Sequence, residues 1–171
     1  DSEARDLLGR IAGSRARLAI HVHQADVAIG QARRALEYLR PDDLPAFPMI
    51  YWTLGVAHIL KGERSEATRV FMEGITAGKK IDHIHGIRMS TIGLGKMQAA
   101  ENKLYLAAET FHQALDMFGE NPLPVAGEAA LDLAYIYYQW NDLVKAAQYG
   151  EQSLKLHRQF AKRIDRCIPS E

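Results

Sequence analysis

The chain has 171 residues, with 21 basic and 21 acidic side chains, and therefore carries no formal net charge. A domain that binds nucleic-acid phosphates usually has a basic excess, so this balance argues against direct contact with DNA. No run of about 18 apolar residues occurs, which argues against a membrane-spanning helix. The single cysteine, Cys167, excludes an internal disulfide and fits the reducing cytoplasm.

Helical periodicity runs through the chain and predicts four helix pairs with no strand. In chain order the expected helices are 2–22 and 25–39, 46–61 and 63–79, 83–101 and 103–118, and 125–140 and 142–160. The corresponding repeats cover about residues 2–40, 46–80, 83–119 and 125–161 of a single domain, 1–171. Residues 163–171 are expected to be a stub beyond the last helix.

Two proline-rich stretches predict long connections between pairs, because proline lacks a backbone donor and disfavours a helical residue before it. They contain Pro41, Pro45 and Pro48, and Gly119, Pro122 and Pro124. Either Pro45 or Pro48 is able to open the third helix, where a missing N–H group costs nothing.

Turns inside the pairs are marked by residues that end or begin helices. Gly62 and Asn102 are predicted at the second and third turns. Asn141 is expected to be the N-cap of the last helix, accepting a hydrogen bond from a free backbone N–H. Glu63 and the Asp42-Asp43 pair stand at helix starts or turns, where carboxylates are expected to cap.

A ladder of small residues sets the period of the chain. The second helix of each pair begins around Ala28, Ala67, Ala107 and Ala146, at intervals of 39, 40 and 39 residues. Seven positions later come Ala35, Gly74, Ala114 and Ser153. A fixed period of this length is typical of helical solenoids. We therefore predict an all-α fold, a right-handed α-α superhelix of about four helix pairs, which favours binding over catalysis.

The repeats resemble the tetratricopeptide pattern, in which W-x2-L-G-x2-Y precedes a small, an aromatic and a small residue. The matching residues are Leu54-Gly55, His58, Ala67, Phe71 and Gly74 in the second pair, Leu94-Gly95, Gln98, Ala107, Phe111 and Ala114 in the third, and Leu133-Ala134, Tyr137, Ala146, Gly150 and Ser153 in the fourth. The first pair is degenerate. The period is longer than the usual ~34 residues of that pattern.

Four stretches carry a more specific resemblance: Arg33-Arg34-Ala35-Leu36, Leu54-Gly55 with Gly62, Ala107 through Gln113-Ala114-Leu115, and Tyr138-Gln139-Trp140-Asn141-Asp142-Leu143. They resemble the helical-repeat region of large MalT-like, LuxR-type transcriptional activators. That resemblance implies an ATPase module before this region and a helix-turn-helix after it. Since no G-x4-G-K-[ST] phosphate loop occurs here, we expect a fragment of a larger protein. This fragment is expected to need no cofactor, with ATP bound only by the missing N-terminal module.

The same resemblance implies a sensor that receives a small-molecule inducer or a regulatory protein or peptide and biases ATP-dependent self-assembly. The first helix of each pair is expected to line a concave binding face, where aromatic rings stack and polar groups orient a ligand. The candidate binding residues are Arg17, His21, Met49, Trp52, Val56, Met89, Lys96, Asp132, Tyr135, Tyr138 and Gln139. For the apolar members, and for Ile59 and Ile92 beside them, packing against neighbouring repeats is the simpler interpretation.

The histidines do not predict a metal site. His21 and His23, and likewise His83 and His85, are two residues apart and do not face one another on a helix. No H-E-x-x-H or paired-cysteine motif accompanies them. His58 occupies the tyrosine position of the repeat and is expected in the core. No Ser/His/Asp or Cys/His arrangement occurs, so we expect neither catalytic residues nor an enzyme.

Two functions from different classes remain open. The first is the effector-sensing region of a MalT-like regulator, and the second is a free-standing tetratricopeptide scaffold that binds a peptide or protein without a role in transcription. A third, weaker interpretation is self-association, in which exposed repeat edges stack between protomers. A phosphate loop upstream and a helix-turn-helix downstream in the full gene distinguish the first from the second.

Overall fold

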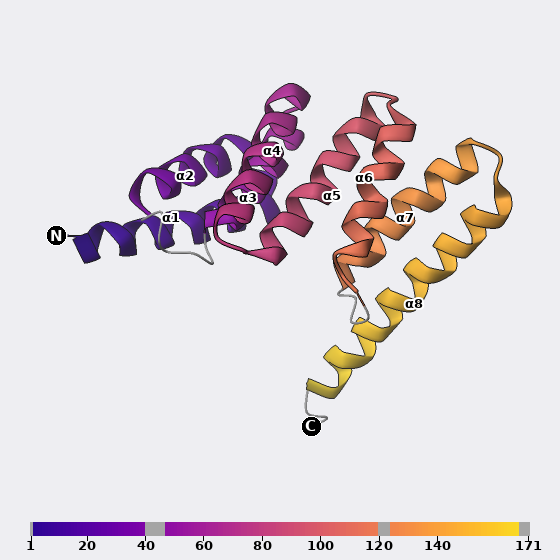
Figure 1. Cartoon of the computed structure of the whole chain (residues 1–171). Helices are drawn as coiled ribbons and strands as arrows, with labels where there is room; N and C mark the ends of the chain where they lie inside the picture. The colour runs from indigo at the N-terminus through magenta and orange to yellow at the C-terminus, as the bar shows by residue number, and fades with distance from the viewer. Residues whose placement is uncertain (1, 40–46, 120–123, 168–171) are drawn as a thin grey trace. The chain divides into compact units, whose positions relative to one another are not determined.

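The computed structural model describes residues 2–39, 47–119 and 124–167, and every regular element in these ranges is an α-helix. In chain order the helices are α1 (Ser2–His21), α2 (Ala25–Tyr38), α3 (Phe47–Leu60), α4 (Arg64–Lys80), α5 (Ile84–Ala100), α6 (Leu104–Asp116), α7 (Pro124–Gln139) and α8 (Leu143–Cys167) (Figure 1). The all-α prediction is confirmed for these residues. The predicted connections at 40–46 and 120–123, with Asp42 and Asp43, lie outside them.

The predicted helix bounds hold to within two residues, except at the end of α8. This helix was expected to stop at Phe160, with a stub from residue 163, and instead continues to Cys167. The stretch between Phe160 and Cys167 contains no glycine or proline, so nothing in it ends the helix. Figure 1 shows α8 extending past the end of α7.

One residue in the left-handed region makes the turn inside each pair. These residues are His23, Gly62, Asn102 and Asn141, with φ of 56°, 76°, 60° and 58°. Their spacing is that of the alanine ladder, 39, 40 and 39 residues. Two backbone hydrogen bonds close each turn; in the third, Asn102 N donates to Ala99 O and Lys103 N to Gln98 O, both at 2.9 Å. The turn positions predicted for Gly62 and Asn102 are confirmed.

Two predicted caps are wrong. Asn141 does not cap α8, because its left-handed backbone makes it the turn residue itself. The cap is the next residue: Oδ1 of Asp142 accepts a hydrogen bond from Lys145 N at 3.1 Å. Glu63 precedes α4 without a side-chain cap bond, since its carboxylate binds His58 and Lys61 instead.

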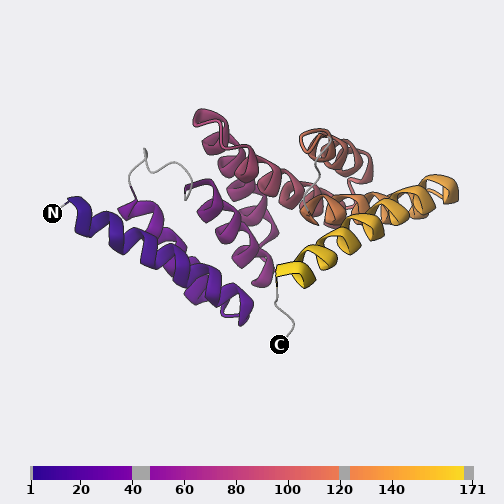
Figure 2. The same cartoon turned by 90° about the horizontal axis from the view of Figure 1, so that it is seen from below.

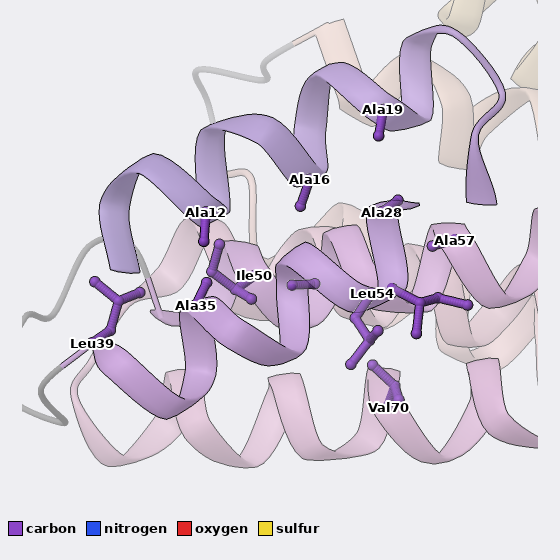
Figure 3. Packing of buried hydrophobic residues seen from close by; sticks show 12 residues of the cluster. Ala12, Ala16, Ala19, Ala28, Ala35, Leu39, Ile50, Leu54, Ala57 and Val70 are labelled. Atoms are coloured by element: carbon purple, nitrogen blue, oxygen red, sulfur yellow. The ribbon is translucent and has the colours of Figure 1, made fainter. Parts of the chain in front are cut away.

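Small side chains bring the helices of the first compact unit, Asp1–Met97, close together. α1 packs along α2, and α3 lies against both. Figure 3 shows Ala12, Ala16 and Ala19 of α1 directed toward α2, in a cluster that continues to Leu54 of α3 and Val70 of α4. Alanines at such contacts allow close approach of the helix axes. The ladder residues Ala28, Ala67 and Ala107 are fully buried, whereas Ala146 is half-buried.

Phe71 of α4 fills the space between α3 and α5, and its side chain is fully buried. Gly55 of α3 and Gly93 of α5 lie against its ring, and a Cβ atom added at either glycine would overlap ring carbons. A Cβ at Gly74 of α4 would likewise come within 2.6 Å of the Ser90 hydroxyl of α5. The Phe71 ring of α4 therefore lies in close contact with a glycine of α3 and a glycine of α5.

The second compact unit, Gln98–Glu171, contains the end of α5 together with α6, α7 and α8. α7 packs against both α6 and α8, and α7 and α8 run side by side in Figure 2. Phe111 of α6 occupies the repeat position of Phe71 and is equally buried, as are Leu133 and Ile136 of α7. The same type of core thus recurs in both units.

The glycine contacts lead to a direct test of the packing. Gly93→Ala should lower the free energy of unfolding by about 1–3 kcal/mol, because the added methyl meets a ring already held from the other side by Gly55. The matched control is Gly30→Ala on the exposed face of α2, where nothing lies within 4 Å of the new Cβ. That change should stabilise the protein by about 0.5–1 kcal/mol, since alanine is the better helix former. Urea denaturation measures both; equal effects of the two variants would contradict the packing.

Candidate functional site

Two neighbouring exposed aromatic side chains of the second unit lie on α7. Tyr135 and Tyr138 are 63% and 66% exposed, and Leu131 beside them is also exposed. The spacing 131, 135 and 138 places the three side chains on one face of the helix. We call these three residues the α7 row. Of the predicted binding residues, Gln139 is exposed and Asp132 half-buried on the same helix.

An exposed apolar row of this kind is unusual for a solvated helix face and is typical of a site that contacts a partner. Tyrosine is enriched in such sites because its ring supplies apolar area and its hydroxyl a hydrogen bond. The sequence predicted Tyr135 and Tyr138 but missed Leu131, which the same spacing would have identified.

In the first unit, the predicted binding residues on α3 take part in packing. Trp52 and Val56 are half-buried and contact a core cluster formed by Ala67, Phe71 and Met97. Ile59 packs against the same cluster, and Ile92 is buried. The packing interpretation therefore describes these side chains, and a binding role for Trp52 and Val56 stays a prediction. Among the other members of this unit, Met49, Met89 and Lys96 are half-buried.

Arg17 and His21 of α1 are both exposed, four residues apart on the helix, and a binding role for them stays a prediction. His21 lines an open recess of about 330 Å³ between the end of α1 and the start of α2, and Arg17 does not. The other residues around the recess are Arg15, Leu18, Ala19, Val22, Gln24, Val27 and Gln31. Sequence reasoning missed this recess, because none of its residues forms a recognisable motif.

Five rings from α6, α7, α8 and the turn between α7 and α8 form an aromatic cluster in the second unit, which the sequence did not predict. Tyr105 of α6 stacks on Trp140 with ring centroids 4.6 Å apart. Tyr137 of α7 meets Trp140 edge to face and stacks in parallel on Tyr149 of α8. The two ring nitrogens of His112 lie 3.2 Å and 3.4 Å from the hydroxyls of Tyr137 and Tyr149.

This aromatic cluster holds α6, α7 and α8 together around the end of the α7 row. A neutral imidazole donates through one nitrogen and accepts through the other, so His112 is able to satisfy both tyrosine hydroxyls. Burial, with a smaller contribution from Tyr137, raises the pKa of the Tyr149 phenol. The Lys145 ammonium lies 4.9 Å from the centre of the Tyr137 ring, within cation–π range. The cluster is therefore best understood as a rigid support for α7.

His58 is buried, as predicted. It begins a chain of polar contacts that runs through the α3–α4 turn to α2. Its Nδ1 atom donates a 2.6 Å hydrogen bond to Oε2 of Glu63. Lys61 binds the other Glu63 oxygen and also Oδ1 of Asp26 on α2, both at 3.0 Å. This chain of contacts connects the α3–α4 turn to the first turn of α2.

The structure gives His83 a structural role: its Nδ1 accepts a hydrogen bond from Gly86 N at 3.0 Å, at the start of α5. His85 lies beside it with ring centroids 6.4 Å apart. Across the described ranges, no three His, Cys, Asp or Glu side chains gather in a way that would hold a metal ion. No helix in these ranges combines the length and apolarity required to cross a membrane.

Paired helices with a small-residue ladder, and an exposed row on the first helix of a pair, define a helical-repeat protein of the tetratricopeptide class. A family model described as the MalT-like TPR region matches residues 9–171. The chain belongs to this family. Proteins with this family match and this fold are typically regulatory or binding regions. A comparison with curated proteins finds no match.

Solved structures confirm the α-α superhelical fold class. The apo form of RapI has a TM-score of 0.82 at 15% identity, over 92% of this chain and 58% of that one. A Rap protein complexed with Competence and Sporulation Factor has a TM-score of 0.77 at 15% identity, over 94% and 44%. Aspartyl phosphate phosphatase F from Bacillus subtilis has a TM-score of 0.79 at 15% identity, over 94% and 42%. This chain thus spans about half the length of these proteins.

The contacts of Glu63 predict a dependence of stability on pH. Hydrogen bonds from His58 and then Lys61 hold the pKa of the Glu63 carboxyl below its ordinary value. A lowered folded-state pKa stabilises the protein above the unfolded pKa of about 4.3, and this contribution is lost as the pH falls through the folded-state pKa. Glu63→Gln should therefore lower the melting temperature at pH 7, and the difference from wild type should narrow below about pH 4.

Glu109→Gln, the same change at an exposed position of α6, is the control. Thermal melts from pH 7 down to acid measure both variants. If the melting temperatures of Glu63→Gln and wild type differed by the same amount across this pH range, the lowered pKa of the Glu63 carboxyl would be contradicted.

Proposed function

We propose that this chain is the effector-sensing and protein-interaction region of a MalT-like, LuxR-family transcriptional regulator, and that it controls activation of the full-length protein. Its membership of the MalT-like TPR family supports this proposal. The observation that carries it is the α7 row, a set of large side chains left exposed on the helix that begins a pair. The region acts by binding, in the cytoplasm, which fits its single cysteine.

The chemistry of the α7 row favours a peptide or protein as the effector. Small-molecule sites are concave and bury most of the ligand, whereas Tyr135 and Tyr138 project from an exposed helix face. Two tyrosine rings offer apolar area at low cost in conformational entropy, and Gln139 adds an amide that pairs with a peptide backbone. A peptide segment laid along α7 would meet all three side chains.

A protein of similar fold supports a bound factor as the effector. One of the solved structures is a Rap protein complexed with Competence and Sporulation Factor. At 15% identity this likeness concerns the fold alone. A helical-repeat framework of this kind therefore carries a bound factor in that protein, and we assign the same type of role to this chain.

Binding changes activity only when the effector has a different affinity for the resting and active states. The aromatic cluster ties the end of α7 to α6 and α8 through Tyr105, Trp140 and Tyr149. A partner held by the α7 row thus acts on a helix whose position is coupled to two others. ATP binding is assigned to a module upstream of this region.

Substitution of Tyr135 tests the proposed site. A thermal-shift screen of wild type against peptides, oligosaccharides and small metabolites should yield a stabilising peptide, whose affinity is then measured by fluorescence anisotropy. Tyr135→Ala should weaken that affinity at least about tenfold, since removing an interface tyrosine commonly costs more than 1.4 kcal/mol. Because Tyr135 is exposed, the fold should be unaffected.

Leu106→Ala removes an exposed side chain of α6, outside both the α7 row and the aromatic cluster, and is the matched control. It should bind the peptide as wild type does. A peptide that binds Tyr135→Ala with unchanged affinity would contradict the site.

The regulator role has its own test in the full coding sequence, which should place a phosphate loop before this region and a helix-turn-helix after it. A gene with neither would contradict the regulator role and favour the scaffold role.

A further inference from the structure

Tyr105, at the start of α6, keeps one face of its ring open to solvent. The other face stacks on Trp140, with ring centroids 4.6 Å apart, and yet the tyrosine side chain is 80% exposed. Trp140 is fixed in turn by its edge-to-face contact with Tyr137. The exposure of Tyr105 is not that of a terminal repeat, because the next pair follows in the chain and supplies the stacking partner.

The repeat itself does not require an aromatic ring at this position. At the spacing of the alanine ladder, the corresponding residues of the first two pairs are Asp26 and Ser65, and both are exposed. A polar side chain therefore suffices where the second helix of a pair begins. A tyrosine that packing does not demand, held in place by a second ring, has the features of a side chain that contacts another molecule.

Glu109 supplies the unbalanced charge beside this ring. It lies one helical turn further along α6, on the same face of the helix, and is exposed. Other carboxylates nearby are neutralised by the chain itself: Lys103 binds Glu101 at 2.7 Å, and Lys145 binds Asp142 at 3.3 Å. In the part of this unit that the structure describes, Glu109 has no such partner. The surface around the open ring is therefore negative.

Another tyrosine of the chain shows which group covers a ring of this kind. The guanidinium groups of Arg5 and Arg34 lie 5.5 Å and 5.3 Å from the centre of the Tyr38 ring in the first pair. A cation within about 6 Å of a ring centre is attracted by its π face. Among the described residues, no cation lies over Tyr105 in this way. Its open face and the neighbouring carboxylate thus suit a cation from outside the chain.

We propose that Tyr105, Trp140 and Glu109 form a docking site for an arginine side chain of a partner protein, which we call the Tyr105 site. A guanidinium group is planar and always charged, so it stacks on the open face of the Tyr105 ring. Its N–H groups donate hydrogen bonds to the Glu109 carboxylate. A flat neutral ligand would leave this carboxylate unused, and a nucleic acid would bring phosphates to a negative surface.

The Tyr105 site is separate from the α7 row. Trp140 is two residues beyond Tyr138, and residues with this spacing do not share a helix face. The docking of an arginine therefore does not depend on an effector at the row. Tyr135 belongs to the α7 row alone and Glu109 to the Tyr105 site alone, so the two proposals are tested separately.

An NMR titration with two pentapeptides tests the Tyr105 site. The first peptide, Ac-Gly-Ala-Arg-Ala-Gly-NH2, should shift the indole N–H resonance of Trp140 and the amide resonances of Tyr105 and Glu109, and leave the indole resonance of Trp52 unchanged. The second peptide has citrulline in place of arginine, which is a planar side chain of the same length without charge. It should bind at least about threefold more weakly, because it lacks the cation for both the ring and the carboxylate.

Substitutions locate the arginine. Tyr105→Ala and Glu109→Gln should each weaken binding of the arginine peptide at least about threefold. Tyr105→Phe, which keeps the ring, and Tyr135→Ala, in the α7 row, should bind it as wild type does. Tyr105 also belongs to the aromatic cluster, whereas Glu109 contacts none of its rings. Glu109→Gln therefore tests the site without disturbing the cluster, and the NMR spectrum verifies that each variant is folded.

Three results would overturn the proposal. The first is an arginine peptide that shifts none of the three resonances or binds no better than the citrulline peptide. The second is an affinity that Glu109→Gln leaves unchanged. The third is a loss of binding in Tyr135→Ala, which would place the peptide on the α7 row instead.

Discussion

The insertion of Phe71 between Gly55 and Gly93 is the contact on which the spacing of the helices depends. A glycine on each side of the ring lets α3 and α5 approach to within the thickness of an aromatic side chain. Close packing of this kind tolerates neither an added methyl nor a cavity. Phe71 of α4 has no exposed surface. Its ring contacts both α3 and α5, so the position of each of these helices depends on the ring. The alanines between α1 and α2 also determine a helix spacing, because their small side chains allow the two helices to touch directly.

This packing also determines which side chains remain outside. Contacts between helices are filled by small residues, by aliphatic residues such as Leu54, and by the buried rings of Phe71 and Phe111, and other large residues lie outside these contacts. Tyr135 and Tyr138 are exposed on α7 for this reason, whereas Trp52, on the corresponding face of α3, is half-buried against the Phe71 cluster. The exposed α7 row and the half-buried Trp52 thus follow from the same kind of helix packing.

Much of the fold was predictable because it follows from local chemistry and from the period. The alanine ladder predicted the helix pairs, and Gly62 and Asn102 predicted two turns, since these residue types adopt positive φ at low cost. Asn141 was assigned to the wrong position because asparagine suits both an N-cap and a left-handed turn. Only its spacing of 39 residues from Asn102 distinguishes the two. The length of α8 was missed although Pro169, two residues after Cys167, is a helix breaker.

The candidate site was predictable in part. The register placed Tyr135, Tyr138 and Trp52 together on one predicted binding face of the first helices, and the two tyrosines are exposed. The burial of Trp52 depends on Met97 of α5, whose approach is a tertiary effect. The aromatic cluster was not predictable, because only the packing of the helices brings Tyr105 and His112 of α6 to Tyr149 of α8 and their neighbours. Repeat periodicity describes contacts between equivalent positions, and this cluster joins positions that are not equivalent.

Hydrogen–deuterium exchange of a Phe71→Leu variant tests the central claim most directly. If the ring between Gly55 and Gly93 sets the spacing of the helices, the smaller side chain leaves a gap, and amides of α3, α4 and α5 lose protection together. Peptides of α8, which lies in the other compact unit, should exchange as in wild type. Unchanged protection in α3 and α5, with loss confined to α4, would contradict the account.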